Sequence, residues 1–129
     1  MKHLICALSL ILFSLATSSA HADNCMEANA SDQIAEGRLA LGQFKDAADR
    51  TETAYILLLP APTCLSAEDP DERVESTDKI HIFSSDDAIQ GTLKSFVGKT
   101  VLVRGTALPA HTVHHHAPIL IDVSEIDQQ

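Results

Sequence analysis

Four histidines lie within six residues of the chain: His111, His114, His115 and His116. Clustered imidazoles can coordinate a transition metal, because imidazole nitrogen suits Zn, Cu and Ni. They can also contact a partner or a small ligand. A third possibility is that they hydrogen-bond the backbone of a turn, since a neutral ring has one donor and one acceptor nitrogen. The sequence leaves all three interpretations open, and all four residues are candidate ligand-binding residues.

Metal binding would use His111, His114 and His116. In an extended segment His114 and His116 point to the same side, and His111 can fold back toward them. Three nitrogens with an open fourth position is the arrangement of catalytic zinc. However, residues 110–118 contain no carboxylate or cysteine, and Asp122 is the nearest acid along the chain. We therefore keep Zn or another transition metal as the possible cofactor and expect no other.

Other polar residues give weaker signals. Arg104 can anchor an anionic group and is a candidate ligand-binding residue, although a lone surface arginine is usually solvated. His81 lies on the polar side of a short alternating run, so we expect it to be exposed. The acidic stretch 68–72 lacks the D-x-D-x-D-G spacing of a calcium-binding loop. It is predicted to be a solvated loop.

Residues 1–22 are predicted to be a signal peptide. They combine a basic start, an apolar run over residues 4–15 and the pattern Ala20-His21-Ala22, which a signal peptidase cleaves. The apolar run is shorter than the roughly 20 residues that span a bilayer. We expect residues 23–129 to form one domain with no membrane span, located in a bacterial periplasm.

After removal of this segment, the remaining cysteines are Cys25 and Cys64. Neither belongs to a C-x-x-C motif or stands beside a histidine, which argues against catalytic thiols. Two cysteines in an oxidising compartment favour one structural disulfide. A Cys25–Cys64 bridge would close a loop of about 39 residues and contribute about 3–4 kcal/mol.

The charge balance limits the partners. The chain has 18 Asp and Glu against 9 Lys and Arg, a formal net charge of −9. Phosphate binding needs clustered Lys and Arg, so nucleic acid is not an expected partner. An acidic domain of this size could neutralise a basic secreted protein. We expect the partner to be an unknown protein or small ligand, and the protein itself to be a monomer.

Five strands and one helix are predicted. Runs typical of strands cover residues 34–44, 53–59, 79–83, 99–107 and 118–123. Residues 84–87 offer helix N-cap side chains, the apolar residues 89, 93, 96 and 97 share one helix face, and Gly98 fits a C-cap. Pro60 and Pro62 should end the second strand, with a loop over 66–78 and a polar tail over 125–129.

Three strands, a helix and two strands is the order of the OB-fold, a small Greek-key barrel. We therefore predict a mainly β fold, a small five-stranded OB-like Greek-key barrel with one α-helix between the third and fourth strands. An open α+β sheet would need a second helix. Only the alanine-containing segment 28–41 offers room for one.

The C-terminal half also resembles a known family. Residues 97–106 (VGKTVLVRGT) and 110–121 (AHTVHHHAPILI) resemble the "GK-V-V-G-T…AHTGHHH-P-VL" signature of a secreted bacterial family, domain of unknown function 4431. Residues 53–64 are similar to its "ETY-IL-LD-P-C" segment. The resemblance covers about residues 52–122. It implies a small, exported, barrel-like domain with the loop histidines as its mark, and it implies no activity.

One departure from that signature bears on the loop. Val113 stands where the family usually has glycine, and a β-branched residue does not suit a turn with positive φ. Two functions then fit the sequence. One is a non-enzymatic, periplasmic binding or inhibitory module of unknown ligand. The other is a metal-binding protein or small metal-dependent hydrolase using His111, His114 and His116.

Overall fold

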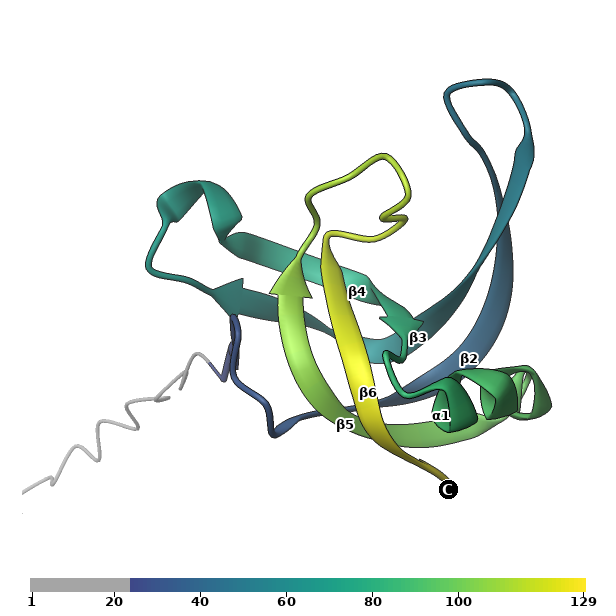
Figure 1. The fold of residues 1–129 in the computed structure, drawn as a ribbon. Helices are drawn as coiled ribbons and strands as arrows, with labels where there is room; N and C mark the ends of the chain where they lie inside the picture. The colour runs from purple at the N-terminus through teal and green to yellow at the C-terminus, as the bar shows by residue number, and fades with distance from the viewer. Residues whose placement is uncertain (1–23) are drawn as a thin grey trace, which may run out of the picture.

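The computed structural model describes residues 24–129 (Figure 1). The predicted signal peptide lies outside these residues. Six strands are present: β1 (Met26–Glu27), β2 (Gln33–Lys45), β3 (Thr51–Ser66), β4 (Val74–Phe83), β5 (Thr100–Pro109) and β6 (Ile119–Gln128). Three short helical segments are the 3-10 helix η1 (Pro70–Glu72), the α-helix α1 (Asp87–Thr92) and the 3-10 helix η2 (Leu93–Phe96).

Five of the strands close into a barrel. β2 pairs antiparallel with β3 and with β5, and β5 pairs antiparallel with β6. β6 then lies parallel to β4, and β4 pairs antiparallel with β3, which closes the ring. The non-sequential neighbours β2–β5 and β4–β6 are Greek-key crossovers, and α1 lies in the connection between β4 and β5. The predicted OB-like barrel is confirmed.

The barrel interior is filled by alternate residues of its strands. The core side chains of β5 are Val101, Val103 and Ala107, and those of β6 are Ile119, Ile121 and Val123. This period of two is what a strand with one buried face requires. Leu93, from η2, is fully buried in the same core, so the helical segment covers one end of the barrel. Figure 1 shows α1 at the end opposite the β5–β6 loop.

β3 is longer than predicted, because Pro60 and Pro62 do not end it. Proline is tolerated in a strand where no ladder hydrogen bond is needed from its nitrogen. The pairing of β3 with β4 is irregular between Leu58 and Thr63, and both prolines fall in that irregular stretch. The two prolines, which were expected to end the strand, therefore lie in an irregular part of one long strand.

Two segments predicted to be irregular are partly in strands. The expected loop 66–78 contains η1 and the first half of β4, whose Val74 and Thr77 pair with β3. The expected polar tail belongs to β6, where Gln128 pairs with Val101 of β5. Backbone pairing satisfies N–H and C=O groups whatever the side chain, so these polar residues extend strands that hydropathy alone would cut short.

The helical segment begins as predicted and ends differently. Asp86 is the N-cap of α1, and its Oδ1 accepts hydrogen bonds from the backbone N–H groups of Ala88 and Ile89. The helix tightens to 3-10 geometry at η2, so Val97 lies beyond it and is 38% exposed rather than packed. Gly98 has φ +86°, a left-handed conformation that glycine adopts at little cost.

The N-terminal segment is tied down by the predicted disulfide. Cys25 and Cys64 are bonded, with their Cα atoms 4.5 Å apart. The bridge holds β1 parallel to the end of β3, where Met26 pairs with Leu65. The alternative of a helix over 28–41 is wrong, because β2 occupies most of that range. Within residues 24–129, no helix is long and apolar enough to cross a membrane.

Candidate functional site

Two connections project from the same end of the barrel (Figure 1). One is the β2–β3 hairpin, and the other is the β5–β6 connection over residues 110–118, hereafter the histidine loop. In an OB-fold, the loops at these two places flank the outer face of the second and third barrel strands, where oligonucleotides and oligosaccharides bind. Here those strands are β3 and β4. The site is built from these two loops and that face.

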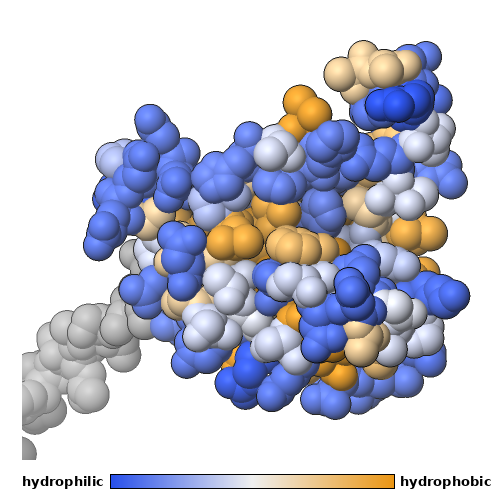
Figure 2. All heavy atoms as spheres, in the orientation of Figure 1, coloured by the Kyte–Doolittle hydropathy of each residue, from blue (hydrophilic) through white to orange (hydrophobic). Residues whose placement is uncertain are grey.

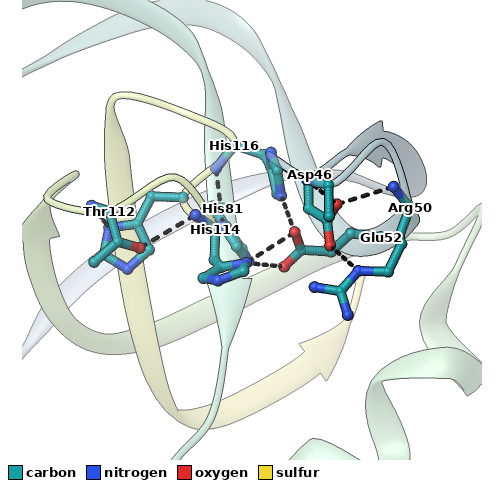
Figure 3. A network of polar contacts seen from close by, with 9 residues as sticks. Asp46, Arg50, Glu52, His81, Thr112, His114 and His116 are labelled. Atoms are coloured by element: carbon teal, nitrogen blue, oxygen red, sulfur yellow. Dashed lines mark hydrogen bonds and ion pairs between the residues drawn. The ribbon is translucent and has the colours of Figure 1, made fainter.

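The tip of the hairpin is held by Asp46. Its Oδ1 accepts hydrogen bonds from the backbone N–H groups of Ala48 and Arg50, and its Oδ2 lies 2.8 Å from Arg50 Nε (Figure 3). These hydrogen bonds, led by the one from the Arg50 backbone, lower the pKa of Asp46. Asp49 takes up the left-handed turn position, with φ 60°. The tip is a defined turn rather than a loose loop.

Below the tip, Phe44 and Glu52 are direct cross-strand partners in the β2–β3 pair, so their side chains share one face. Glu52 reaches the histidine loop: its Oε1 and Oε2 lie 2.9 and 3.0 Å from His114 Nδ1. The hydrogen bond from His114 lowers the pKa of Glu52 against the opposing effect of desolvation. Glu52 therefore clasps the two loops together (Figure 3).

His116 is the most enclosed member of the cluster, with a side chain only 8% exposed. Its ring stacks on Phe44, with centroids 4.0 Å apart and planes within 7°, and it lies 5.9 Å from the His81 ring on the other side. Its Nε2 is 3.4 Å from Glu52 Oε2, which is ion-pair distance. The contact is an ion pair rather than a hydrogen bond, and among residues 24–129 this buried nitrogen has no hydrogen-bond partner.

Gly42 makes room for the Phe44 ring. The two residues stand two apart on β2, and a Cβ built on Gly42 would lie 2.6 Å from Cε2 of Phe44. A side chain at position 42 would therefore push the ring away from its stack with His116. The glycine is part of the site although it contacts no polar group.

His81 is the residue that the sequence placed wrongly. It is half-buried rather than exposed, and its Nδ1 accepts a hydrogen bond from the backbone N–H of His116 at 3.2 Å. Burial, assisted by the neighbouring His116 and His115, lowers its pKa from 6.5 to about 4. His81 thus enters the site from β4 as a neutral ring.

His115 holds the loop from within. Its Nδ1 accepts hydrogen bonds from the backbone N–H groups of His111, at 2.8 Å, and Thr112, at 3.3 Å. Its own N–H donates to the carbonyl of Thr112. Burial and the neighbouring histidines lower its pKa. The interpretation that histidines hydrogen-bond the turn is confirmed for His115.

The histidine loop lies against an apolar outer layer of the barrel. Ile56, His81 and Leu120 are neighbours across β3, β4 and β6, so their side chains share a face. The alternating residues Leu57, Ile80 and Ile121 point into the core, which puts this face on the outside. Ile56 is nevertheless 5% exposed and Leu120 1% exposed. Ala54 and Ala117 are also buried outside the main core.

Several predicted site residues do not join this cluster. Arg104 lies in mid-β5, where its Nε is 3.5 Å from Glu125. Asp122 accepts hydrogen bonds from the backbone and hydroxyl of Ser85, before α1. The His111 side chain is exposed. In the described part of the chain, no group of three or more His, Cys, Asp or Glu is arranged to hold a metal ion. The set His111, His114 and His116 is therefore not assembled as a metal centre.

Val113 causes no strain in the loop. In residues 24–129 the only non-glycine residues with positive φ are Asn29 and Asp49, so the turn has adapted to valine. Its side chain is 68% exposed at the loop surface. The site as a whole is a packed, hydrogen-bonded cluster whose exposed parts are Val113, Thr112 and the rings of His111 and His114.

Glu52 and Phe44 were missed in the sequence. Both lie in runs that read as ordinary strand ends, and Glu52 is 62 residues from His114. The single signal that bears on them is the register of the hairpin, which cannot be read until the turn at Asp46 is known.

Comparison with known proteins gives one match. No curated protein and no solved structure matches the chain. The profile of a family described as "Domain of unknown function (DUF4431)" matches residues 79–127, from the end of β4 through the helical segment to the end of β6. That range includes His81 and the whole histidine loop, and the match supports the family that the sequence resembles.

Proposed function

We propose that this protein is a small exported binding or inhibitory module without enzymatic activity, which meets its ligand with the clasped hairpin and histidine loop. The observation that carries the proposal is the Glu52 clasp. It joins, at 2.9–3.4 Å, the two loops that flank the ligand face of an OB-fold. A surface that is ordered before binding loses less entropy when the partner arrives.

The state of the histidines supports a non-enzymatic role. His81 and His115 each use Nδ1 to accept backbone N–H groups, so that nitrogen is not available to take a proton from a substrate. Five pockets of the described residues are lined by side chains other than these histidines. Catalysis needs both a base and a place for the reacting group.

Compartment and charge favour a protein partner outside the cytoplasm. The Cys25–Cys64 disulfide is compatible with an extracellular protein. The net charge of −9 favours a partner with a basic surface, since complementary charge speeds association and rejects wrong partners. Figure 2 shows both hydrophilic and apolar residues on the two parts that project at the top of the view.

Site-specific photo-crosslinking tests the proposal. A benzophenone amino acid is placed at Val113 in the loop, or at Val97 beyond the helical segment as an exposed control. In periplasmic extract, we expect one adduct at position 113, none at position 97, and competition by excess unlabelled protein. Equal labelling at both positions, or no competable adduct at position 113, would contradict the proposed binding surface.

A further inference from the structure

The histidine loop covers side chains that a barrel surface would otherwise expose. Ile56 and Leu120 flank His81 on the outer face, and both are almost completely buried although they lie outside the main core. The His116 and His115 rings both lie within 6.3 Å of the His81 ring, centroid to centroid. The loop therefore acts as a cover over β3, β4 and β6.

Three of the hydrogen bonds that hold this cover are accepted by two imidazoles, which must be neutral to accept them. The Nδ1 of His81 accepts the N–H of His116, and the Nδ1 of His115 accepts the N–H groups of His111 and Thr112. A neutral ring that accepts at Nδ1 carries its proton on Nε2, and the next proton must go to Nδ1. Protonation then turns each acceptor into a donor that faces another donor.

The loop has too few negatively charged neighbours to balance several protonated histidines. The titratable groups that act on His81 and His115 are Glu52 from β3 and, besides each other, His111, His114 and His116 from the loop. Phe44, from β2, adds no charge. Asp46 at the hairpin tip acts on His114 but is already paired with Arg50. One carboxylate, that of Glu52, thus stands in a cluster of five imidazoles, and it can balance one positive charge.

We propose that the histidine loop is a pH-sensitive lid, which lies closed on the outer face of β3, β4 and β6 while His81 and His115 are neutral and opens when they take up protons. Acid should open the lid rather than close it, because both Nδ1 acceptors are lost when the rings are protonated. The lowered pKa values of His81 and His115 agree with it, because burial in the closed lid disfavours the charged rings. An open lid would return both rings to water.

Acid therefore shifts the lid toward the open state. For each proton taken up on opening, the open population rises by at most about tenfold per pH unit between the free and the closed pKa. For His81 that window runs from 6.5 down to about 4. Opening would uncover Ile56 and Leu120 for a ligand. That consequence rests on the proposed function, whereas the opening itself does not.

Amide hydrogen exchange measured by NMR tests the lid. The His116 N–H reports the lid, and the Leu39 N–H, which donates to the Lys99 carbonyl in the core, reports global unfolding. After correction for the intrinsic pH dependence of exchange, we expect His116 protection to fall severalfold or more per unit from neutral pH to about pH 5. His116 should exchange much faster than Leu39 at every pH in this range, because the lid opens while the core stays folded.

Matched variants assign the effect. His81→Asn keeps an acceptor near the position of Nδ1 but cannot titrate, so the fall in His116 protection should be smaller. His111→Asn removes an exposed neighbour of His115 that accepts none of the loop hydrogen bonds, and it should keep a pH-dependent loss of His116 protection. If H81N does not fold, the ring-nitrogen spectra of wild-type His81 must show protonation over the pH range in which His116 loses protection.

The lid is overturned if His116 protection does not depend on pH, if His116 exchanges no faster than Leu39, or if folded H81N retains the wild-type pH dependence. These outcomes are separable from the crosslinking result. A pH-dependent lid without an adduct at Val113 contradicts the binding function alone, and an adduct with a pH-independent lid contradicts the lid alone.

Discussion

At the scale of single residues, the four loop histidines are not equivalent. His115 is committed to the backbone through Nδ1, and His114 pairs with Glu52 at the surface. His116 is nearly buried and stacks on Phe44, whereas the ring of His111 is exposed. The sequence alone suggests that all four histidines do the same chemistry, because they stand side by side in one loop. The structure gives each ring a separate contact, and the contacts decide which rings can gain a proton without cost.

Substitution of two glycines should have opposite effects. Gly42→Ala places a Cβ 2.6 Å from the Phe44 ring and should displace it from His116, which costs about 1 kcal/mol, the worth of one aromatic pair. Gly91→Ala meets nothing within 4 Å in α1 and should stabilise by about 0.5–1 kcal/mol. Urea denaturation at neutral pH measures both. If both variants shifted the urea midpoint equally and in the same direction, Gly42 would not be needed to hold the Phe44 ring in place.

At the scale of elements, the site exists because two loops far apart in the chain are folded toward each other. The Asp46 turn sets the hairpin register, the register puts Phe44 and Glu52 on one face, and that face meets the histidine loop. Each of these steps involves neighbouring residues, but together they bring Glu52 to His114, which is 62 residues away in the chain. The loop therefore derives its order from β3 as much as from its own turn.

Removing the clasp should loosen the loop without unfolding the barrel. Glu52→Gln keeps the shape of the side chain but loses the charge that faces His114 and His116. We expect lower protection of the loop amides and little change in the denaturation midpoint, because exposed pairs contribute little to global stability. Asp49→Asn, at an exposed hairpin position, is the control. Unchanged loop protection in E52Q would mean that the stacked rings alone hold the lid.

The order of elements could be predicted from the sequence, and the contacts between them could not. Alternating hydropathy located the strands and N-cap residues located α1, because both signals are local. The ends of β3 and β6 were missed, since they are fixed by pairing with another strand. His81 was expected to be exposed for the same reason. Nothing within residues 79–83 shows that a loop from beyond β5 covers this position.

At the scale of the whole molecule, the disulfide ties an N-terminal strand of two residues to the barrel. The bridge spans 39 residues, and its loss should cost about 3–4 kcal/mol through the entropy of the unfolded chain. A variant with both Cys25→Ser and Cys64→Ser should show this in urea denaturation. Reduced wild type should match it. A loss well below 1 kcal/mol would mean that β1 adds nothing to the fold.

The pH dependence of global stability follows from the same groups as the lid. The pKa of His81 falls from 6.5 in the unfolded chain to about 4 in the folded one, and the pKa of His115 is also lowered. Between these values the unfolded chain binds protons that the folded chain does not, so acidification favours unfolding. Glu52 and Asp46 have lowered pKa values, and their contribution is lost only at still lower pH.

The unfolding free energy should therefore decrease as the pH falls from about 6.5 to 4, and decrease further below that. One fully buried histidine would give about 1.4 kcal/mol per pH unit. Since His81 is only half-buried, solvent screening should narrow the pH range over which this slope applies. Urea midpoints measured across this range should be flatter in His81→Asn above pH 4 and unchanged in slope below it. A wild-type midpoint that stays constant down to about pH 5 would show that these rings titrate alike in both states.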